Sequence, residues 1–302
     1  MQRVALIGLS ALGVAVCCST AAAQFSYRSG VEVAAFAVTV LNRNGEAVAD
    51  LGREDFEVRE DGVVQPVTYF SAGTAEGAVP LHLGLLFDTS ESMQKELTFS
   101  RNAAIRFLNT FPRALDFTLV EFDDDVRAAR FSQAEFPRLV ERIRSRKARG
   151  RTSLYDAMTI YLGSAYDQTG RKVLVLYTDG GDTSSSRTWD ETIRLLRASD
   201  VTVYSVGFVA NARGSERLML QSKLMEIARV TGGKAAFPGS MKELEPVYDA
   251  IADEIHAQYL VGYVPTNPAR DGKWRKVEIK LRKPPSERLQ VRSRDGYFGP
   301  VK

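Results

Sequence analysis

The 302-residue sequence is poor in the residues on which many enzymes and disulfide-linked proteins depend. Its two cysteines, Cys17 and Cys18, lie near the N-terminus, and it has two histidines, His82 and His256. Neither histidine has a nucleophile or carboxylate at a spacing typical of a catalytic site. The sequence also has no Gly-x-Ser-x-Gly elbow, P-loop or dinucleotide-binding glycine motif. We therefore expect a protein that is not an enzyme.

The sequence also lacks an apolar run long enough to span a membrane comfortably. Residues 1–23 carry Arg3, an apolar run over 4–16 and small residues at 21–23. This pattern is typical of a secretory signal peptide cleaved before Gln24. We expect an exported protein, periplasmic or secreted. A lipoprotein is the weaker alternative, because Val16 rather than a small residue precedes Cys17.

Removal of this segment would leave a mature chain without cysteine, whose stability must come from core burial. The chain has 40 basic and 37 acidic residues, and Arg3 is the charged residue that cleavage removes, so 39 and 37 remain, a net charge of +2. So small an excess indicates neither nucleic acid nor a membrane surface as a partner. A hydrophobic content of 44% fits one large or two modest globular domains.

A buried strand followed by polar side chains organises the middle of the chain. The apolar run 81–87 ends on Asp88, and Ser90 and Ser92 follow at alternate positions. Ser92 is the expected N-cap of a helix over 93–111. Ligands of open α/β sheets bind outside the carboxyl ends of the strands, and these oxygens favour Mg²⁺, Mn²⁺ or Ca²⁺. The alternative is that they only cap the helix and close the turn.

Two further segments place oxygen-bearing side chains in comparable positions. Thr152 precedes a helix expected over 154–166, and its hydroxyl is either an N-cap or a ligand. A second buried strand over 173–178 ends on Asp179 and a glycine-rich turn. Both segments therefore favour a site at the carboxyl edge of one sheet.

Together, Asp88-Thr89-Ser90-Glu91-Ser92, the distant Thr152 and Thr178-Asp179-Gly180 resemble the von Willebrand factor type A domain and its metal-ion-dependent adhesion site. The resemblance implies that hydroxyls bind the ion and that carboxylates hold it directly or through water. It also implies an adhesion-type protein whose Mg²⁺, Mn²⁺ or Ca²⁺ is completed by an Asp or Glu of a protein partner. The implied metal ligands are Asp88, Ser90, Ser92, Thr152 and Asp179, and the expected rim residues are Glu91, Arg151, Tyr155, Gly180 and Asp182.

Strands alternate with helices from residue 80 to 257, which predicts an α/β fold with a doubly wound, mostly parallel sheet. The turn at 123–125 would close a hairpin to one antiparallel edge strand. The expected strands are 81–87, 117–122, 126–131, 173–178, 201–206 and 234–237, and the expected helices are 93–111, 135–144, 154–166, 188–198, 218–231 and 241–257.

Strand patterns flank this domain on both sides. Residues 24–79 contain a strand near 31–40 and a hairpin expected over 55–70, and residues 258–302 return to strand patterns. Neither segment has enough strands to bury a face alone, so we expect them to pack into one β-sandwich-like module. The chain also resembles the VWFA-related family of secreted bacterial proteins, in the sequence segments 54–62, 259–263 and 294–297.

Two charged clusters have alternative interpretations. Six basic residues between Arg142 and Arg151 form either a solvated helix end or a rim that steers an acidic ligand. Glu121 and residues 123–125 form either a hairpin turn, which is favoured, or a second cation site. For the whole protein, an envelope assembly role with a fold-stabilising metal and a metal-assisted hydrolase stay open as alternatives.

Overall fold

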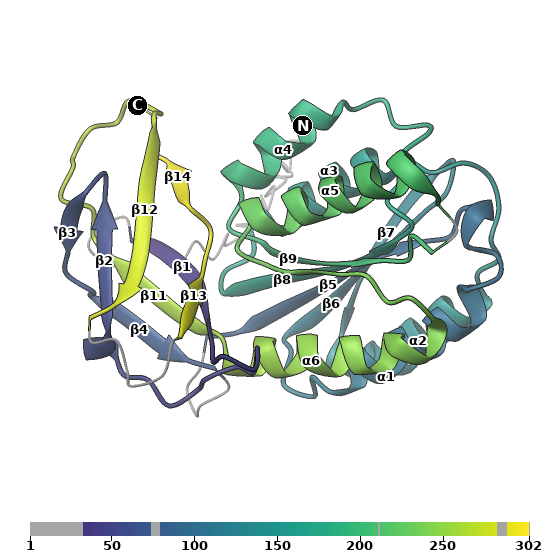
Figure 1. Cartoon of the computed structure of the whole chain (residues 1–302), viewed down its shortest axis with the longest axis horizontal. Helices are drawn as coiled ribbons and strands as arrows, with labels where there is room; N and C mark the ends of the chain where they lie inside the picture. The colour runs from purple at the N-terminus through teal and green to yellow at the C-terminus, as the bar shows by residue number, and fades with distance from the viewer. Residues whose placement is uncertain (1–32, 74–78, 211, 283–288, 302) are drawn as a thin grey trace, which may run out of the picture.

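A computed structural model describes residues 33–73, 79–210, 212–282 and 289–301 (Figure 1). The predicted signal peptide lies outside these residues. The described chain contains a six-stranded sheet with helices on both faces and two four-stranded sheets beside it. The expected fold class, a doubly wound sheet with a β-sandwich-like module, is confirmed.

The central sheet has the strand order β10-β9-β8-β5-β6-β7, and its strands are parallel except β7, which pairs antiparallel with β6. β5 and β8 are buried along their whole length, because helices cover both faces of the sheet. The strands are β5 (Leu81–Asp88), β6 (Asp116–Phe122), β7 (Val126–Ser132), β8 (Arg171–Thr178), β9 (Thr202–Gly207) and β10 (Ala235–Ala236).

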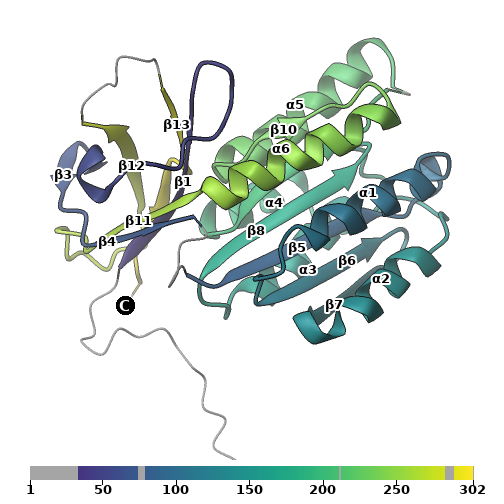
Figure 2. The same cartoon turned by 90° about the horizontal axis from the view of Figure 1, so that it is seen from below.

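Three helices lie on each face of this sheet. α1, α2 and α6 cover one face, and α3, α4 and α5 cover the other (Figures 1 and 2). Each layer has its own apolar core. The helices are α1 (Leu97–Asn109), α2 (Phe136–Ser145), α3 (Leu154–Ala165), α4 (Trp189–Ala198), α5 (Gly214–Val230) and α6 (Leu244–Ala257).

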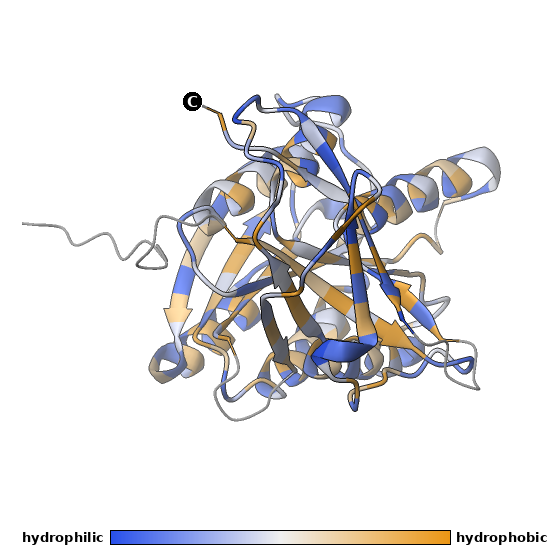
Figure 3. Ribbon diagram, turned by 90° about the vertical axis from the view of Figure 1, so that its left-hand side faces the viewer, coloured by the Kyte–Doolittle hydropathy of each residue, from blue (hydrophilic) through white to orange (hydrophobic). Residues whose placement is uncertain are grey.

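The N- and C-terminal parts of the described chain interleave in a β-sandwich. Its sheets have the orders β13-β1-β11-β4 and β14-β12-β2-β3, so each sheet takes strands from both parts. Buried and exposed residues alternate along β12, and Figure 3 shows such banding. The strands are β1 (Ala34–Leu41), β2 (Phe56–Glu60), β3 (Val63–Gln65), β4 (Tyr69–Ala72), β11 (Tyr259–Tyr263), β12 (Trp274–Leu281), β13 (Gln290–Arg292) and β14 (Gly296–Phe298).

The hairpin expected over 55–70 is only half correct. β2 and β3 pair across Asp61 and Gly62, which both have positive φ, at 48° and 86°. The pairing stops at Gln65, and β4 joins the opposite sheet beside β11. Pro66 follows Gln65 and has no N–H with which to continue the ladder, so the chain crosses between the sheets there.

Three helix starts also differ from the prediction. Ser92 is not an N-cap, because the chain first makes a 3-10 turn over Glu91–Met93 and α1 begins at Leu97. The N-cap of α3 is Ser153 rather than Thr152. α5 begins at Gly214 rather than 218, since its first turn is polar and exposed and gives no apolar periodicity. Among the described residues, no helix is long and apolar enough to cross a membrane.

Candidate metal centre

Asp88 and Thr178 end two neighbouring strands at the centre of the sheet. β5 pairs with β8 in parallel, with Phe87 opposite Tyr177. The next residues, Asp88 and Thr178, therefore lie side by side. Because both strands are buried along their length, they hold this carboxylate and this hydroxyl on a rigid support.

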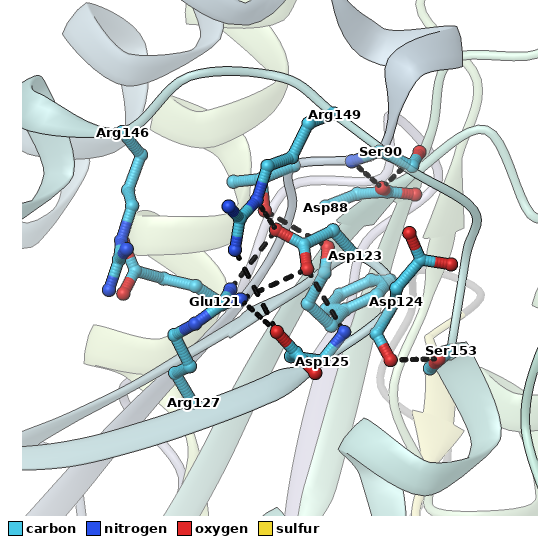
Figure 4. Close-up of polar contacts among 12 residues, drawn as sticks. Asp88, Ser90, Glu121, Asp123, Asp124, Asp125, Arg127, Arg146, Arg149 and Ser153 are labelled. Carbon is cyan, nitrogen blue, oxygen red and sulfur yellow. Dashed lines mark hydrogen bonds and ion pairs between the residues drawn. The ribbon is translucent and has the colours of Figure 1, made fainter.

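Hydroxyl and amide donors enclose the Asp88 carboxylate. Oδ1 accepts hydrogen bonds from the main-chain N of Ser90 at 2.9 Å and from Ser90 Oγ at 2.6 Å, and Oδ2 accepts one from Thr178 Oγ1 at 2.6 Å. Figure 4 shows the contacts between Asp88 and Ser90. The Asp88 residue is 0% exposed. Thr178, which the sequence analysis did not assign to the site, therefore orients its central carboxylate.

The charges around Asp88 disfavour its ionised form. Burial and the nearby charge of Asp179 raise the pKa of Asp88 to about 7, from an ordinary value of 3.8, although hydrogen bonds from Ser90 and Thr178 lower it. Across the described ranges, neither carboxylate forms an ion pair with a lysine or arginine. Two neighbouring carboxylates without a cation are stabilised by a proton or by a bound cation.

Ser92 and Asp179 complete the polar group around Asp88. Ser92 is exposed on the 3-10 turn, and its Oγ lies 3.0 Å from Ser90 Oγ. Asp179 is half-buried, and its Oδ1 accepts a hydrogen bond from Gly181 N at 3.0 Å. The first turn thus supplies one carboxylate and two hydroxyls, and the Asp179 carboxylate of the second turn is near enough for its charge to act on Asp88.

Thr152 is held near this group by its main chain. Gly150 O accepts a hydrogen bond from Glu91 N at 3.0 Å, and Thr152 O accepts one from Thr183 N at 2.9 Å. Thr152 N donates to Thr183 Oγ1 at 3.0 Å. The Thr152 loop therefore bonds both to the turn after Asp88 and to the segment after Asp179. In the described part of the chain, the Thr152 hydroxyl makes no hydrogen bond to the other four predicted ligands.

The five predicted rim residues have different surroundings. Glu91 and Arg151 are exposed, and Arg151 Nε lies 3.0 Å from Asp124 Oδ1. Tyr155 is buried, and its hydroxyl accepts a hydrogen bond from Lys223 Nζ at 2.9 Å. Tyr155 therefore packs into the domain and is not a surface contact.

Gly180 and Asp182 support the second turn. Gly180 has φ of +86°, which favours glycine, and it packs against Leu220 and Leu224 of α5. Asp182 accepts hydrogen bonds from Tyr155 N at 3.2 Å and from Ser185 Oγ at 2.6 Å. Asp182 thus fastens the segment after Asp179 to the start of α3.

The donor set fits a hard divalent cation. Hydroxyl and carboxylate oxygens are the ligands that Mg²⁺, Mn²⁺ and Ca²⁺ prefer, and within the described ranges the buried Asp88 has no cationic partner to satisfy its charge. Among the described residues, no group of three His, Cys, Asp or Glu side chains could hold a metal. The serine and threonine oxygens are therefore essential to any metal site here.

The histidines lie away from this edge. His82 Nδ1 is 3.0 Å from Asp116 Oδ2, and His82 Nε2 is 3.0 Å from Thr169 O, at the amino ends of the strands. The sequence analysis missed this carboxylate partner, which the pairing of β5 with β6 supplies. His256 stacks on Phe111 with ring centroids 4.6 Å apart. A cavity of about 1200 Å³ also opens at the amino edge, between the sheet and the sandwich.

The chain thus combines an open, doubly wound α/β sheet of the Rossmann-like class with an Asp-x-Ser-x-Ser turn at its carboxyl edge. The family model of the von Willebrand factor type A domain matches residues 82–246, more than half of the chain. The chain therefore belongs to the von Willebrand factor type A family. No curated protein matches the chain.

Solved structures share the fold at low sequence identity. The pilus adhesin SpaC of Lactobacillus rhamnosus GG, in its open conformation, has a TM-score of 0.53 at 10% identity, with 82% of this chain and 48% of the adhesin covered. The chain thus spans about half of that adhesin's length. A von Willebrand factor type A protein of Catenulispora acidiphila has a TM-score of 0.51 at 14% identity, with 90% and 75% covered.

A third structure covers a smaller share of this chain. The vWF domain of the type V pili tip protein Mfa5 of Porphyromonas gingivalis has a TM-score of 0.50 at 13% identity, with 59% of this chain and 95% of that domain covered. At these identities the likeness establishes the fold and carries no residue-level argument.

Proposed function

We propose that this chain is an exported, non-enzymatic binding protein of the adhesion type, which recognises a protein partner through a divalent cation. The observation that carries the proposal is the buried Asp88 carboxylate, which has hydroxyl donors and a second carboxylate nearby but no cationic partner among the described residues. The fold likeness to a pilus adhesin and to the vWF domain of a pilus tip protein supports the adhesion class.

Ser90, Ser92 and Thr152 would contribute hydroxyl oxygens to Mg²⁺, or to Mn²⁺ or Ca²⁺, and Asp88 and Asp179 would contribute carboxylates. Thr178 and the Ser90 amide keep the Asp88 carboxylate in one orientation. When bound, the cation would supply an electrophilic position that an Asp or Glu of the partner can fill. The exposed turn carrying Ser92 leaves that position open to a partner.

The positions of the histidines support a non-enzymatic role. Neither lies at the carboxyl edge, and the partners of His82 are Asp116, Gln168 and a main-chain carbonyl rather than a nucleophile. A structural role in the envelope, with a metal that only stabilises the fold, is the alternative. It predicts that Asp88→Ala lowers stability but leaves association intact.

The test is calorimetric titration of Mg²⁺ and Mn²⁺ into metal-stripped protein, beside Asp88→Ala and Thr152→Ala. We expect one ion to bind the wild type and both substitutions to weaken it. Partner capture then follows in the presence and absence of a chelator. Equal capture in both conditions would contradict recognition through a cation.

A further inference from the structure

The arginine-rich segment before Thr152 is ion-paired to the carboxylates at the end of the β6–β7 hairpin (Figure 4). Glu121 accepts hydrogen bonds from Arg142 Nε and Arg146 Nε, each at 2.8 Å. The Glu121 side chain is only 1% exposed. The last turn of α2 and the residues after it are thus fixed to the end of β6.

Asp123 is the centre of the network. Its Oδ2 accepts hydrogen bonds from Arg127 Nη1 at 3.0 Å and from Arg149 Nε at 3.2 Å, and its Oδ1 accepts one from Asp125 N at 3.0 Å. The Asp123 side chain is 4% exposed, whereas that of Arg149 is 62% exposed. Arg149 therefore reaches from the surface to a carboxylate whose position is already fixed.

Asp124 fixes the next part of the loop. Its Oδ1 lies 3.0 Å from Arg151 Nε. Its carboxylate also packs on Gly150, which has φ of +67°, and a Cβ at position 150 would lie 2.0 Å from Asp124 Oδ2. We call the pairs Arg149–Asp123 and Arg151–Asp124 the arginine clasp. The two arginines of the clasp flank Gly150, and Arg151 directly precedes Thr152.

Main-chain hydrogen bonds also connect this loop to the metal centre. Ser153 N donates to Asp123 O at 3.1 Å, and Arg149 N donates to Thr89 O at 2.9 Å. Thr89 N in turn donates to Phe122 O at 2.9 Å. Thr152 therefore lies between Arg149, which bonds to the turn after Asp88, and Ser153, which bonds to the hairpin.

We propose that Arg149 and Arg151 are positioning residues, which set the place of the Thr152 hydroxyl through the arginine clasp and so raise affinity for the cation. This inference rests on the proposed function. Five arginines in the network face four carboxylates, which leaves one net positive charge. Four of the six basic residues of the run are paired in this way, so the main role of these four is to hold the loop.

The direction of the change in Mg²⁺ affinity distinguishes a positioning role of the two arginines from a purely electrostatic effect of their charges. Removal of a nearby positive charge should by itself favour a divalent cation, since the repulsion is reduced. Loss of positioning should instead weaken binding. Residues that orient metal ligands typically contribute about 10–100-fold in affinity. We expect Arg149→Ala/Arg151→Ala to weaken Mg²⁺ binding about tenfold or more in calorimetric titration.

Two variants serve as controls. Arg149→Lys retains the charge and can still reach Asp123, so it should bind Mg²⁺ within about twofold of wild type. Arg138→Ala removes an arginine of α2 that is 73% exposed and pairs with Glu135 at 2.8 Å, so it should have no effect. Both arginines are more than 60% exposed and Asp123 keeps its bond to Arg127, so the double variant should fold with nearly the same melting temperature. Mg²⁺ binding by the double variant as tight as in wild type, or tighter, would overturn the positioning role.

Hydrogen exchange of segment 149–153 in metal-free protein tests the same inference without the metal. We expect faster exchange in the double variant than in Arg138→Ala, because the main-chain bonds from residue 153 to Asp123 O and from residue 149 to Thr89 O should open more often without the side-chain ion pairs. Failure of the wild type to bind Mg²⁺ or Mn²⁺ would count against the proposed function. Unchanged exchange in segment 149–153 would count against the clasp itself.

Discussion

Asp88 makes stability depend on pH in the metal-free protein. Its pKa is raised to about 7 in the folded state, from 3.8, chiefly by burial and then by Asp179. A carboxyl with a raised pKa contributes its stabilisation below its unfolded pKa and loses it as pH rises through the folded value. At about 1.4 kcal/mol per pKa unit, the loss between pH 4 and pH 8 is up to about 4 kcal/mol.

Thermal unfolding in chelator at pH 5, 6, 7 and 8 measures this effect. We expect the melting temperature of the wild type to fall towards pH 8, and Asp88→Asn, which cannot ionise, to flatten this fall. Asp249→Asn is the matched control, because Asp249 is an exposed aspartate on α6. Parallel pH profiles for wild type and Asp88→Asn would show that Asp88 does not control the dependence.

Thr178 should affect the cation by orienting Asp88, and its hydroxyl also accepts a hydrogen bond from Gly180 N at 3.1 Å. Thr178→Val keeps the shape but removes the hydroxyl that donates to Asp88 Oδ2 at 2.6 Å. We expect about tenfold weaker Mg²⁺ binding and a loss of about 1–3 kcal/mol of unfolding free energy. Thr178→Ser keeps the donor and should restore most of both. Calorimetry and urea denaturation give the two quantities, and equal affinities for the two variants would argue against orientation by Thr178.

The sequence predicted the residue types at the centre but not all of their contacts. Asp88, Ser90 and Asp179 stand where buried strands end, so their shared edge follows from the pattern. The orienting role of Thr178 depends on the register of β5 against β8, which joins residues 90 positions apart. Ser92 fits the sequence preference for an N-cap, but its hydroxyl lies beside Ser90 instead of capping α1.

The conformation of the loop before α3 depends on the positive φ of Gly150. Gly150 combines φ of +67° with direct contact to Asp124. Gly150→Ala should therefore reduce the unfolding free energy by more than the roughly 1–3 kcal/mol expected of backbone strain, and should also weaken Mg²⁺ binding. Differential scanning calorimetry and metal titration test both effects.

Gly45→Ala is the matched control for this loop. Gly45 also has positive φ, at +79°, but no atom lies within 4 Å of the Cβ that alanine would add. It should show the cost of strain alone, with Mg²⁺ affinity unchanged. If Gly150→Ala behaved like Gly45→Ala in both measurements, contact with Asp124 would not be what holds the loop.

Helices and strands were predicted well where one periodicity is sustained, as in β5 and β8. Their assignment to sheets was harder, because strand patterns do not state which strand is the partner. β4 reads as the second half of a hairpin, yet it pairs with β11, which lies nearly two hundred residues further on. The arginine run was equally hard to interpret, since its partners on β6 and the following turn are close only in the folded chain.

For the whole molecule, Arg294 links the sandwich to the α/β domain. Its guanidinium donates to Ser199 O, after α4, and to Ala35 O, in β1, each at 2.9 Å, and it stacks 4.6 Å from the centroid of Phe36. Removal of this partly buried guanidinium would leave the two carbonyls without their donor, which is costly on both sides of such a contact. We expect Arg294→Ala to uncouple the unfolding of the two parts.

The two tryptophans report on the two parts separately. Trp189 begins α4 and Trp274 begins β12. In Trp189→Phe and Trp274→Phe backgrounds, urea unfolding should give one shared midpoint when Arg294 is present and two midpoints in Arg294→Ala. Coincident midpoints in all four proteins would show that other contacts, such as the Arg292–Glu254 pair, suffice to couple them.

The path of the chain through the sandwich has a consequence for how such molecules can diversify. β4 ends at Ala72 and β11 begins at Tyr259, and these two residues are paired neighbours in one sheet. The whole α/β domain is thus a loop insertion whose two ends lie about 5 Å apart, as cross-strand neighbours do. A domain joined in this way can be exchanged without a change in the β-sandwich. Recombination could replace the α/β domain while every strand of the sandwich kept its partner.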